Sequence, residues 1–253
     1  MNLRGLQTLF DKEVRRFTKV LVQTVLAPVI MALLFLMIFG HLLQDRLTVY
    51  DGVNYGTFLV PGLVMMTLIQ QAFANASSSL IQSKMSGSIV FVLLAPISPL
   101  EFFLAFVGAA VVRGLLVGLG VLLAAWLLVD IGVVSLIWAF TFAVLASAFV
   151  GAMGLIAGIW ADKYEHLAAV QSFVIVPLSF LSGVFYSIHS LPEQWAEISR
   201  FNPFFYMIDG FRYGFVGASD VSPWLSLWVS LGALGGVAGL ALVLLWRGYK
   251  LRK

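Results

Sequence analysis

Residues 20–43 read VLVQTVLAPVIMALLFLMIFGHLL, an apolar run that contains no Asp, Glu, Lys or Arg. A helix needs about 20 predominantly apolar residues to cross the hydrocarbon core of a bilayer, and this run is long enough. A cleavable signal peptide would instead have a short apolar core ahead of a cleavage site made of small residues. The run therefore predicts a membrane-spanning helix that is not removed by processing.

Five further apolar runs of similar length follow the first. They cover residues 57–77, 101–129, 133–160, 167–186 and 224–246. Hydrophobic residues make up 61% of the 253 residues and charged residues 11%, whereas about 25% of an ordinary soluble domain is charged. We therefore expect one all-α membrane domain over residues 1–253 with six transmembrane helices. Spans one to five lie within 20–186, and span six is 224–246.

The first 19 residues are too polar to cross a membrane, but they repeat apolar side chains at three- and four-residue steps. This stripe consists of Leu3, Leu6, Phe10, Val14 and Phe17. The cations Lys12, Arg15, Arg16 and Lys19 fall mainly on other faces of the same helix. The pattern predicts a basic amphipathic helix that lies in the interface against anionic headgroups.

Lys and Arg residues predict the orientation, because they resist translocation. With the N-terminus inside, eleven of them lie in cytoplasmic segments and three lie outside. Both termini, including a tail at 247–253, are therefore expected in the cytoplasm of a multi-pass protein of the bacterial inner membrane. The net charge of +3 is explained by these span ends, and no basic patch of the size that binds nucleic acid is present.

The connection 187–223 is expected on the outer side, and its second half, 203–216, is strongly aromatic. That half is too short to cross about 30 Å as a helix, which predicts a re-entrant helix that caps a pathway. A helix on the outer surface that braces the last two spans is an equal alternative. Asp209 and Arg212 lie three apart and are expected to brace this helix if they pair.

Catalytic motifs are missing from the sequence. There is no Cys, no phosphate-binding loop and no His-Glu-x-x-His, and His41, His166 and His189 lie at expected span ends or in loops. Arg113 lies near the expected middle of a span, where a lone cation costs about 2.5 to 3.5 kcal/mol. It is expected either to contact an anionic substrate headgroup in a pathway or to cap carbonyl groups of a neighbouring span.

The connection 78–100 joins the second and third expected spans. It has a polar break at 83–88, a short apolar stretch Ile89–Leu94, and the prolines Pro96 and Pro99. Proline is excluded from regular helix interiors, so a short helix and a stiff turn are expected. This element is suited to receive a push from a soluble partner, although an inert linker would have the same pattern.

Several of these segments together resemble the permeases of type-2 ATP-binding-cassette exporters, particularly YadH-like and NodJ-like members, over essentially the whole chain. The matching motifs, in addition to the amphipathic start, are Val60-Pro61-Gly62-Leu63, Leu93-Leu94-Ala95-Pro96-Ile97-Ser98-Pro99, Arg113-Gly114, Leu181-Ser182-Gly183-Val184-Phe185-Tyr186, Asn202-Pro203 and Gly210-Phe211-Arg212-Tyr213-Gly214. The resemblance implies a pair of six-span permeases, here favoured as a homodimer, with two cytoplasmic ATPase subunits. These partner subunits would hold ATP and Mg²⁺, so that the permease itself is not an enzyme and binds no cofactor.

The resemblance also implies where the partner docks and where the pathway closes. The expected ATPase-docking residues are Glu13, Arg15, Arg16, Ser83, Lys84, Ser86, Gly87, Ile89 and Phe91. The expected pathway or outer-gate residues are Arg113, Phe185, Tyr186, Phe204, Phe205, Tyr206, Phe211 and Arg212. Related connections often carry an acid just after the Ile, whereas Val90 follows Ile89 here, so no docking salt bridge is assigned.

The expected cargo is amphipathic, either drug-like or linked to a lipid or glycan, because the apolar runs offer little charge recognition. Two other functions fit a polytopic membrane protein. An ion-coupled transporter or channel is disfavoured because such proteins usually bury several ionisable groups in their spans. A non-transporting membrane assembly factor is the other alternative.

Overall fold

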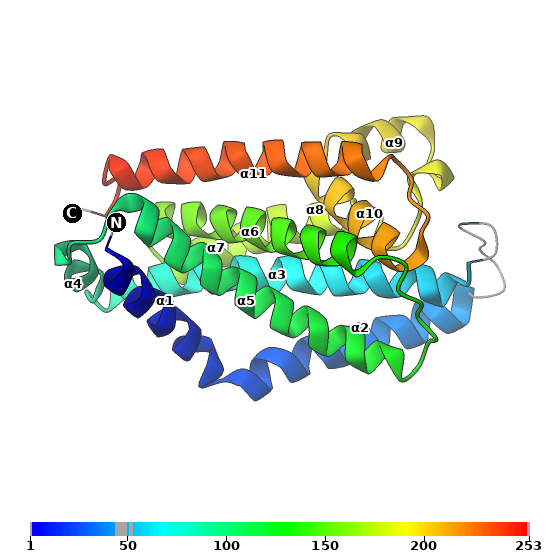
Figure 1. Ribbon diagram of the computed structural model, residues 1–253, viewed down its shortest axis with the longest axis horizontal. Coiled ribbons are helices and arrows are strands. Elements are labelled where there is room, and N and C mark those ends of the chain that lie inside the picture. Colours follow the sequence, from blue (N-terminus) through cyan, green and yellow to red (C-terminus); the bar gives the residue numbers. More distant parts are fainter. Residues whose placement is uncertain (1, 44–49, 51–52, 252–253) are drawn as a thin grey trace.

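The computed structural model describes residues 2–43, 50 and 53–251, and within these ranges every regular element is a helix. Figure 1 shows an elongated bundle whose long helices run between two ends. One end carries α1 (Leu3–Thr18) and α4 (Ile89–Leu94), and both termini of the chain lie there. We call this the α1 end. The opposite end carries α9 (Glu193–Arg200) and α10 (Pro203–Val216), and we call it the α10 end.

Five helices in the described part of the chain are long and apolar enough to cross a membrane. They are α2 (Leu21–Leu43), α3 (Tyr55–Met85), α5 (Pro99–Trp126), α6 (Leu136–Trp160) and α11 (Pro223–Trp246). Each coincides with one of the expected runs, and α3 continues eight residues beyond the expected end at 77 because 78–85 stays helical.

Burial separates the central helices from the peripheral ones. In the most apolar windows of α3 and α6, 72% and 78% of the residues are buried inside the protein, against 17% for α2 and 11% for α11. Helices α3 and α6 therefore form the core of the bundle. Most of the apolar surface of α2 and α11 is exposed and can contact lipid or another chain.

Side chains next to the helix ends fix where the helices begin. Ser98 and Glu101 form a reciprocal capping box at the start of α5, and Pro99 occupies the first turn, where its missing N–H costs nothing. The Asn54 side chain accepts the N–H of Gly56 at the start of α3. The turn expected around the prolines is thus present between α4 and α5.

The fifth expected span, 167–186, is shorter than predicted. The chain is helical through α7 (Tyr164–Val170), a π-helical turn (Gln171–Ile175) and α8 (Val176–Phe180), and it then leaves the helix at 181–186. Pro177 has no N–H and its ring crowds the preceding turn, which explains the wider π-helical turn before it. These 17 residues extend for about 25 Å at 1.5 Å per residue.

The expected outer region 187–223 contains a short 3₁₀ turn (Ile188–Ser190) followed by α9 and α10. Helix α10 begins at Pro203 after an Asn202 cap and ends at Gly217, whose φ of +74° is readily adopted only by glycine. Its residues pack against α3, α6 and α11. The aromatic segment is therefore a helix at the α10 end with most of its residues buried against the bundle.

Candidate functional site

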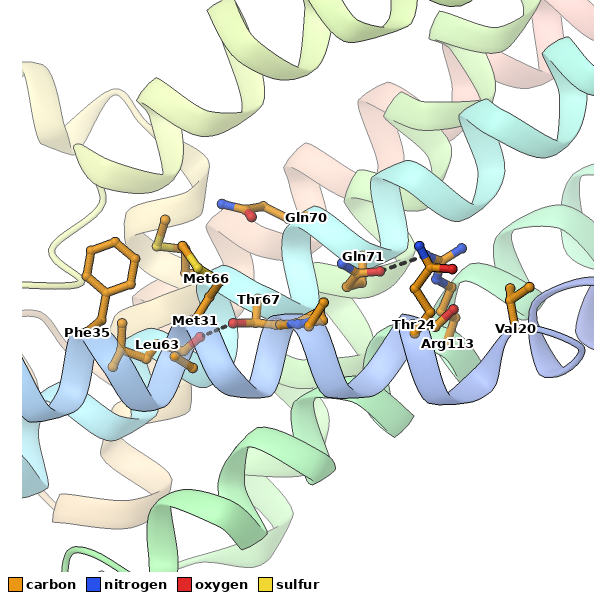
Figure 2. Close-up of a pocket in the computed structure, with 14 residues that line it drawn as sticks. Val20, Thr24, Met31, Phe35, Leu63, Met66, Thr67, Gln70, Gln71 and Arg113 are labelled. Carbon is orange, nitrogen blue, oxygen red and sulfur yellow. Dashed lines mark hydrogen bonds between the residues drawn. The ribbon is translucent and has the colours of Figure 1, made fainter.

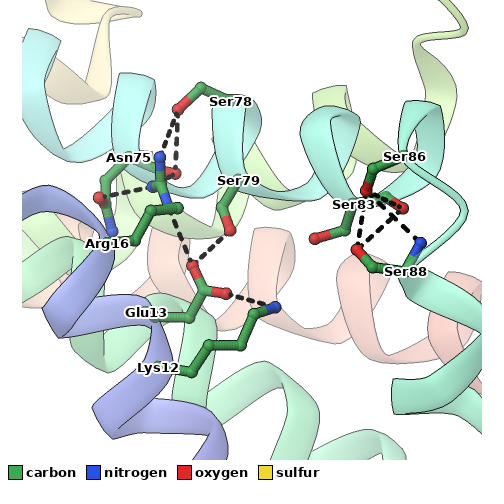
Figure 3. Close-up of polar contacts among 9 residues, drawn as sticks. All are labelled: Lys12, Glu13, Arg16, Asn75, Ser78, Ser79, Ser83, Ser86 and Ser88. Atoms are coloured by element: carbon green, nitrogen blue, oxygen red, sulfur yellow. Dashed lines mark hydrogen bonds and ion pairs between the residues drawn. The ribbon is translucent and has the colours of Figure 1, made fainter.

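A buried acid joins α1 to α3 at the α1 end. Glu13 is fully buried, accepts a hydrogen bond from the Ser79 hydroxyl and lies 3.3 Å from Lys12 and 3.5 Å from Arg16 (Figure 3). Arg16 also donates to the backbone oxygen of Asn75 at 2.8 Å and to its side-chain oxygen at 2.9 Å. Helix α3 supplies hydrogen-bond partners for both members of the pair, while Glu13 Oε1 and Arg16 Nε have ion-pair contacts without a hydrogen bond. Helix α1 is thereby fixed on the bundle.

Three of the residues expected to dock an ATPase are held inside the protein in this way. Glu13 is internal, and Ser83 is buried with its carbonyl oxygen accepting from Ser86 and Ser88. The Lys84 ammonium donates to carbonyl oxygens at the end of α6, including Ile159 at 3.0 Å, and lies 3.8 Å from Asp162. These three side chains therefore contact other parts of the protein, and the exposed surface of the α1 end is formed by residues next to them in the sequence.

The exposed part of the α1 end is largely apolar. Phe91 is 77% exposed and Leu94 78%, and Val90 is half exposed on the same short helix, while Ile89 is buried against the core. Arg15, Ser86 and Gly87 are exposed nearby. Large exposed apolar patches mark surfaces that contact another protein or a membrane. We refer to Val90, Phe91, Leu93 and Leu94 as the α4 patch.

The α4 patch is connected mechanically to α1. The backbone N–H of Asn2 donates to the Glu101 carboxylate, and the Asn2 amide donates to the carbonyl of Pro96 at 3.3 Å. Glu101 is buried and also accepts the N–H of Ser98 at 2.7 Å. The start of α1, the turn after α4 and the start of α5 therefore share one buried carboxylate.

A cavity of about 540 Å³ lies among α2, α3 and α5, and we call it the Arg113 cavity (Figure 2). Its lining consists of Val20, Gln23, Thr24, Ala27, Pro28, Met31, Ala32, Phe35, Leu63, Met66, Thr67, Gln70, Gln71 and Arg113. One guanidinium nitrogen, Nη2, donates to Gln71 Oε1 at 2.7 Å, and Nε is buried without a hydrogen-bond partner among the described residues. Arg113 therefore lies in a cavity, with a side-chain amide as its partner.

Two other cavities lie near the two ends of α2. The basic cavity, of about 920 Å³, lies at the α1 end and shares Val20 with the Arg113 cavity. The Asp130 cavity, of about 500 Å³, lies further along and is lined by Leu36, Met37 and Asp130 among others. The Arg113 and Asp130 cavities are therefore both lined by α2, whereas the basic cavity is lined by residues of α1 and α3 and meets the Arg113 cavity at Val20.

Asp220 fastens the connections at the α10 end. It accepts hydrogen bonds from the Tyr50 hydroxyl at 2.8 Å, from the N–H of Ile188 at 2.8 Å, and from the Ser187 hydroxyl. Burial raises the pKa of the Tyr50 hydroxyl well above its usual range, and the nearby Asp220 contributes to the shift. Tyr50 therefore stays protonated and donates to Asp220.

Asp209 on α10 continues this network. Its two oxygens accept the backbone N–H groups of Asp220 at 2.8 Å and Val221 at 3.2 Å. Burial raises the pKa of Asp209 to about 6, although the Asp220 N–H and the Arg212 charge act in the opposite direction. Asp209 binds the chain after α10, whereas Arg212 binds other segments, so the two residues brace different parts of the α10 end.

Arg212 brings three of the sequence motifs together. It is fully buried, donates through Nη2 to the carbonyl of Gly183 and lies 3.9 Å above the ring of Phe58. A Cβ atom on Gly62 would come within 2.7 Å of the carbonyl oxygen of Val184. The segments around 60, 183 and 212 therefore meet in one tightly packed site.

The aromatic residues expected at an outer gate are mostly internal. Phe204, Phe205 and Phe211 are buried, while Tyr206 is half-buried. Phe185 and Tyr186 are half-buried, and the Phe185 ring lies 5.3 Å from that of Phe39 on α2. These side chains are packed into the α10 end, and Phe185 contacts α2 through Phe35 and Phe39.

The sequence interpretation did not include the polar residues that surround Arg113. Gln23, Thr24, Thr67, Gln70 and Gln71 line the cavity with it. Each is a polar residue within an apolar run, which is a signal that the sequence contains. The partners Tyr50 and Asp220 were missed because they lie in connections far apart along the chain.

Comparison with known proteins places these features in context. A family model described as ABC-2 type transporter matches residues 4–216, which include α1 through α10. The chain is 39% identical to the inner membrane transport permease YadH of Escherichia coli (strain K12), over 86% of this chain and 85% of that protein. It is 25% identical to nodulation protein J of Rhizobium meliloti (strain 1021), over 73% of this chain and 69% of that protein.

Proposed function

The chain belongs to the ABC-2 type transporter family, and we propose that it is the membrane-spanning permease of an exporter driven by a separate cytoplasmic ATP-binding-cassette ATPase. ATP and Mg²⁺ bind the ATPase subunits, and the permease converts their movement into movement of cargo. The observation that supports this most directly is the α4 patch, an exposed apolar surface at the same end as α1 and both termini. A soluble partner bound there covers that surface.

The contacts behind the α4 patch support a route for the movement. A displacement of α4 reaches the turn before α5, where Glu101 accepts hydrogen bonds from Ser98 and from Asn2 of α1. Helix α1 is in turn fixed to α3 through Arg16 and Asn75. Rigid packed elements of this kind transmit a displacement without absorbing it. Movement at α4 therefore reaches α1, α3 and α5 together.

We further propose six crossings of the inner membrane with both termini in the cytoplasm. The 17 helical residues 164–180 connect the two ends of the bundle: Trp160, just before them, lies beside Lys250, and Leu178 accepts a hydrogen bond from Asn202 at the α10 end. Two permease chains act as a homodimer with two ATPase subunits. The peripheral position of α2 and α11 supports this, because much of their apolar surface is free for a second copy.

The cargo is an amphipathic molecule that follows the face of α2. The Arg113 and Asp130 cavities support this choice, because each combines polar groups with apolar side chains of α2. Carboxylates that would couple transport to ions are not found within α2, α3, α6 or α11. This favours an ATP-driven cycle over an ion-coupled one.

Copurification of the ATPase tests the proposal. A tagged permease at native level should bring down a soluble ATP-binding-cassette subunit, and Phe91→Glu should weaken this at least tenfold because a charge is placed in an apolar contact. Phe201→Glu is the matched control, since Phe201 is 89% exposed near the α10 end and its replacement should leave the partner bound.

Two results would contradict the proposal. If the wild-type protein recovers no ATPase, the proposed ATPase partner is contradicted. If transport continues after every associated ATPase is deleted, the ion-coupled alternative is favoured. If the ATPase is recovered but its hydrolysis never responds to added amphiphiles, an assembly factor fits better. Arg16 and Lys84 are unsuitable test positions, because both hold helices together.

A further inference from the structure

The Arg113 cavity contains a positive charge without a negative partner. Of the residues that line it, Arg113 is the one that carries a charge, and its hydrogen-bond acceptor is the neutral amide of Gln71 at 2.7 Å. Its Nε is buried without a partner among the described residues. A cation removed from water in a membrane protein is costly unless an anion, carbonyl groups or water compensates it. This site therefore favours an anionic group.

The cavity is polar at one end and apolar at the other. Figure 2 shows Arg113, Gln71 and Thr24 together at one end, with Phe35, Met66 and Met31 at the other. Methionine and phenylalanine adapt to flexible apolar chains, and about 540 Å³ is a normal size for a ligand site. The shape therefore suits a molecule with a charged head and an apolar tail.

The polar end faces the basic cavity. Val20 lines both cavities, and the basic cavity carries Lys12, Arg15, Arg16 and Lys19 with the acid Asp11. Glu13 pairs with two of these cations, which leaves Arg15 and Lys19 as further positive charges. Clustered cations at a membrane surface attract anionic headgroups from the adjacent leaflet. An anionic amphiphile entering from the α1 end would thus pass the cations of the basic cavity before it reaches Arg113.

From these observations we infer that the Arg113 cavity binds a single-headed anionic amphiphile, with its phosphate, sulfate or carboxylate on Arg113 and its apolar tail beside Met31, Phe35 and Met66. The inference rests on the proposed function, since it names the class of cargo. Binding occurs in the orientation of a lipid of the leaflet at the α1 end. A neutral amphiphile would contact only the apolar end of the cavity, and a free inorganic anion would contact only Arg113.

Direct binding to the purified full-length permease, without any ATPase, tests the inference. The probes are radiolabelled oleoyl lysophosphatidate and oleoyl lysophosphatidylcholine in neutral detergent, which share the acyl chain and differ in headgroup charge. The wild type should bind lysophosphatidate about tenfold more tightly. A hundredfold excess of inorganic phosphate should not displace it, because phosphate has no tail for the apolar end.

Variants assign this preference to the cavity. Arg113→Gln should reduce the preference to less than twofold, and Arg113→Lys should retain most of it. Arg200→Gln is the matched control, since Arg200 is an exposed arginine near the α10 end. Ala27→Trp fills the cavity from an exposed position on α2 and should weaken binding of both lipids, which keeps the test valid if Arg113→Gln does not fold.

Three outcomes would overturn the inference: equal binding of the two lipids by the wild type, full competition by inorganic phosphate, or an unchanged preference in Arg113→Gln together with unchanged affinity for both lipids in Ala27→Trp. Full competition would indicate a site for free anions. The assay contains no ATPase, so loss of ATPase copurification with intact lipid preference contradicts the proposed function alone. The reverse combination contradicts the cargo class alone.

Discussion

Gly62 is the residue at which α3 and the chain after α8 approach most closely. A Cβ atom there would lie 2.7 Å from the backbone oxygen of Val184 and 3.1 Å from its Cα, and backbone atoms cannot move aside as a side-chain tip does. Gly62→Ala should therefore destabilise the detergent-solubilised protein by about 1–3 kcal/mol, which is the usual cost of overpacking. A thermal unfolding scan measures this as a lower midpoint.

Gly232 provides the control for this comparison. It lies on α11, and a Cβ atom there would meet nothing within 4 Å among the described residues. Gly232→Ala should leave the midpoint unchanged or raise it slightly, because alanine has the higher helix propensity. Equal midpoints for the two variants would show that the contact between Gly62 and Val184 is not tight.

Asp209 should make stability depend on pH in an unusual direction. Its pKa is about 6 in the folded protein against 3.8 for an ordinary Asp, so the folded state binds the proton more readily than the unfolded state. The contribution of Asp209 to stability is therefore greatest below pH 4 and declines as pH rises to about 6. The unfolding midpoint of the wild type minus that of Asp209→Asn should therefore decrease between pH 4 and about pH 6 and stay constant at higher pH.

All other titratable groups are present in both the wild type and Asp209→Asn, so their contributions to the pH dependence of the midpoint cancel in the difference. Parallel midpoint curves for the two proteins between pH 4 and pH 7 would mean that Asp209 is ionised throughout, held by the N–H groups of Asp220 and Val221.

At the residue scale, the sequence identified Arg113 but not its surroundings. A lone arginine in an apolar run can be identified as unusual from the sequence, because placing a charged side chain within a bilayer costs much free energy. Its acceptor Gln71 lies on another helix, and that pairing depends on how α3 and α5 pack. Glu13 was expected on a docking surface and is internal, because nothing in the amphipathic pattern of 1–19 distinguishes an interface with lipid from one with α3.

At the element scale, the crossing by residues 164–180 can be tested by labelling. The chain has no Cys, so Glu165→Cys and Glu197→Cys each introduce a single thiol at an exposed position. A membrane-impermeant maleimide should label Glu197→Cys from outside the inner membrane and Glu165→Cys only in inverted vesicles. Labelling of both from one side would show that the segment turns back within the bilayer and that the protein has five crossings.

Five of the expected runs correspond to long helices because their length and apolar content leave little alternative in a bilayer. Run 167–186 was predicted with the wrong C-terminal boundary. Its last six residues are equally apolar in composition, but Gly183 adopts a φ of +74° and the chain packs against Gly62 and Arg212. Hydropathy does not distinguish a spanning residue from one buried by protein at the same depth.

At the scale of the whole molecule, the expected assembly contains two copies of the 27.7 kDa chain. Native mass spectrometry of the complex released from gentle detergent should give a mass with two permease chains and two ATPase chains. A permease that remains a single chain at every protein concentration would contradict the homodimer. Phe201→Glu, which changes an exposed residue away from the α4 patch, should leave the mass unchanged.

The Arg113 and Asp130 cavities along α2 could not be predicted from the sequence, although their polar residues were visible in it. Each is lined by more than one element, and their placement depends on the angle at which α2 crosses its neighbours. The general location of the α1 and α4 surface was predictable, because the Lys and Arg bias assigns both segments to one side.

The two ends of the chain lie together at the α1 end, which has a practical consequence (Figure 1). A flexible linker on that side can join the end of one copy to the start of another, so that a single gene encodes a tandem protein. The transport rate of this tandem protein could be measured with Arg113 altered in the first copy alone and then in both copies. The comparison would show whether one transport cycle requires one intact Arg113 cavity or two.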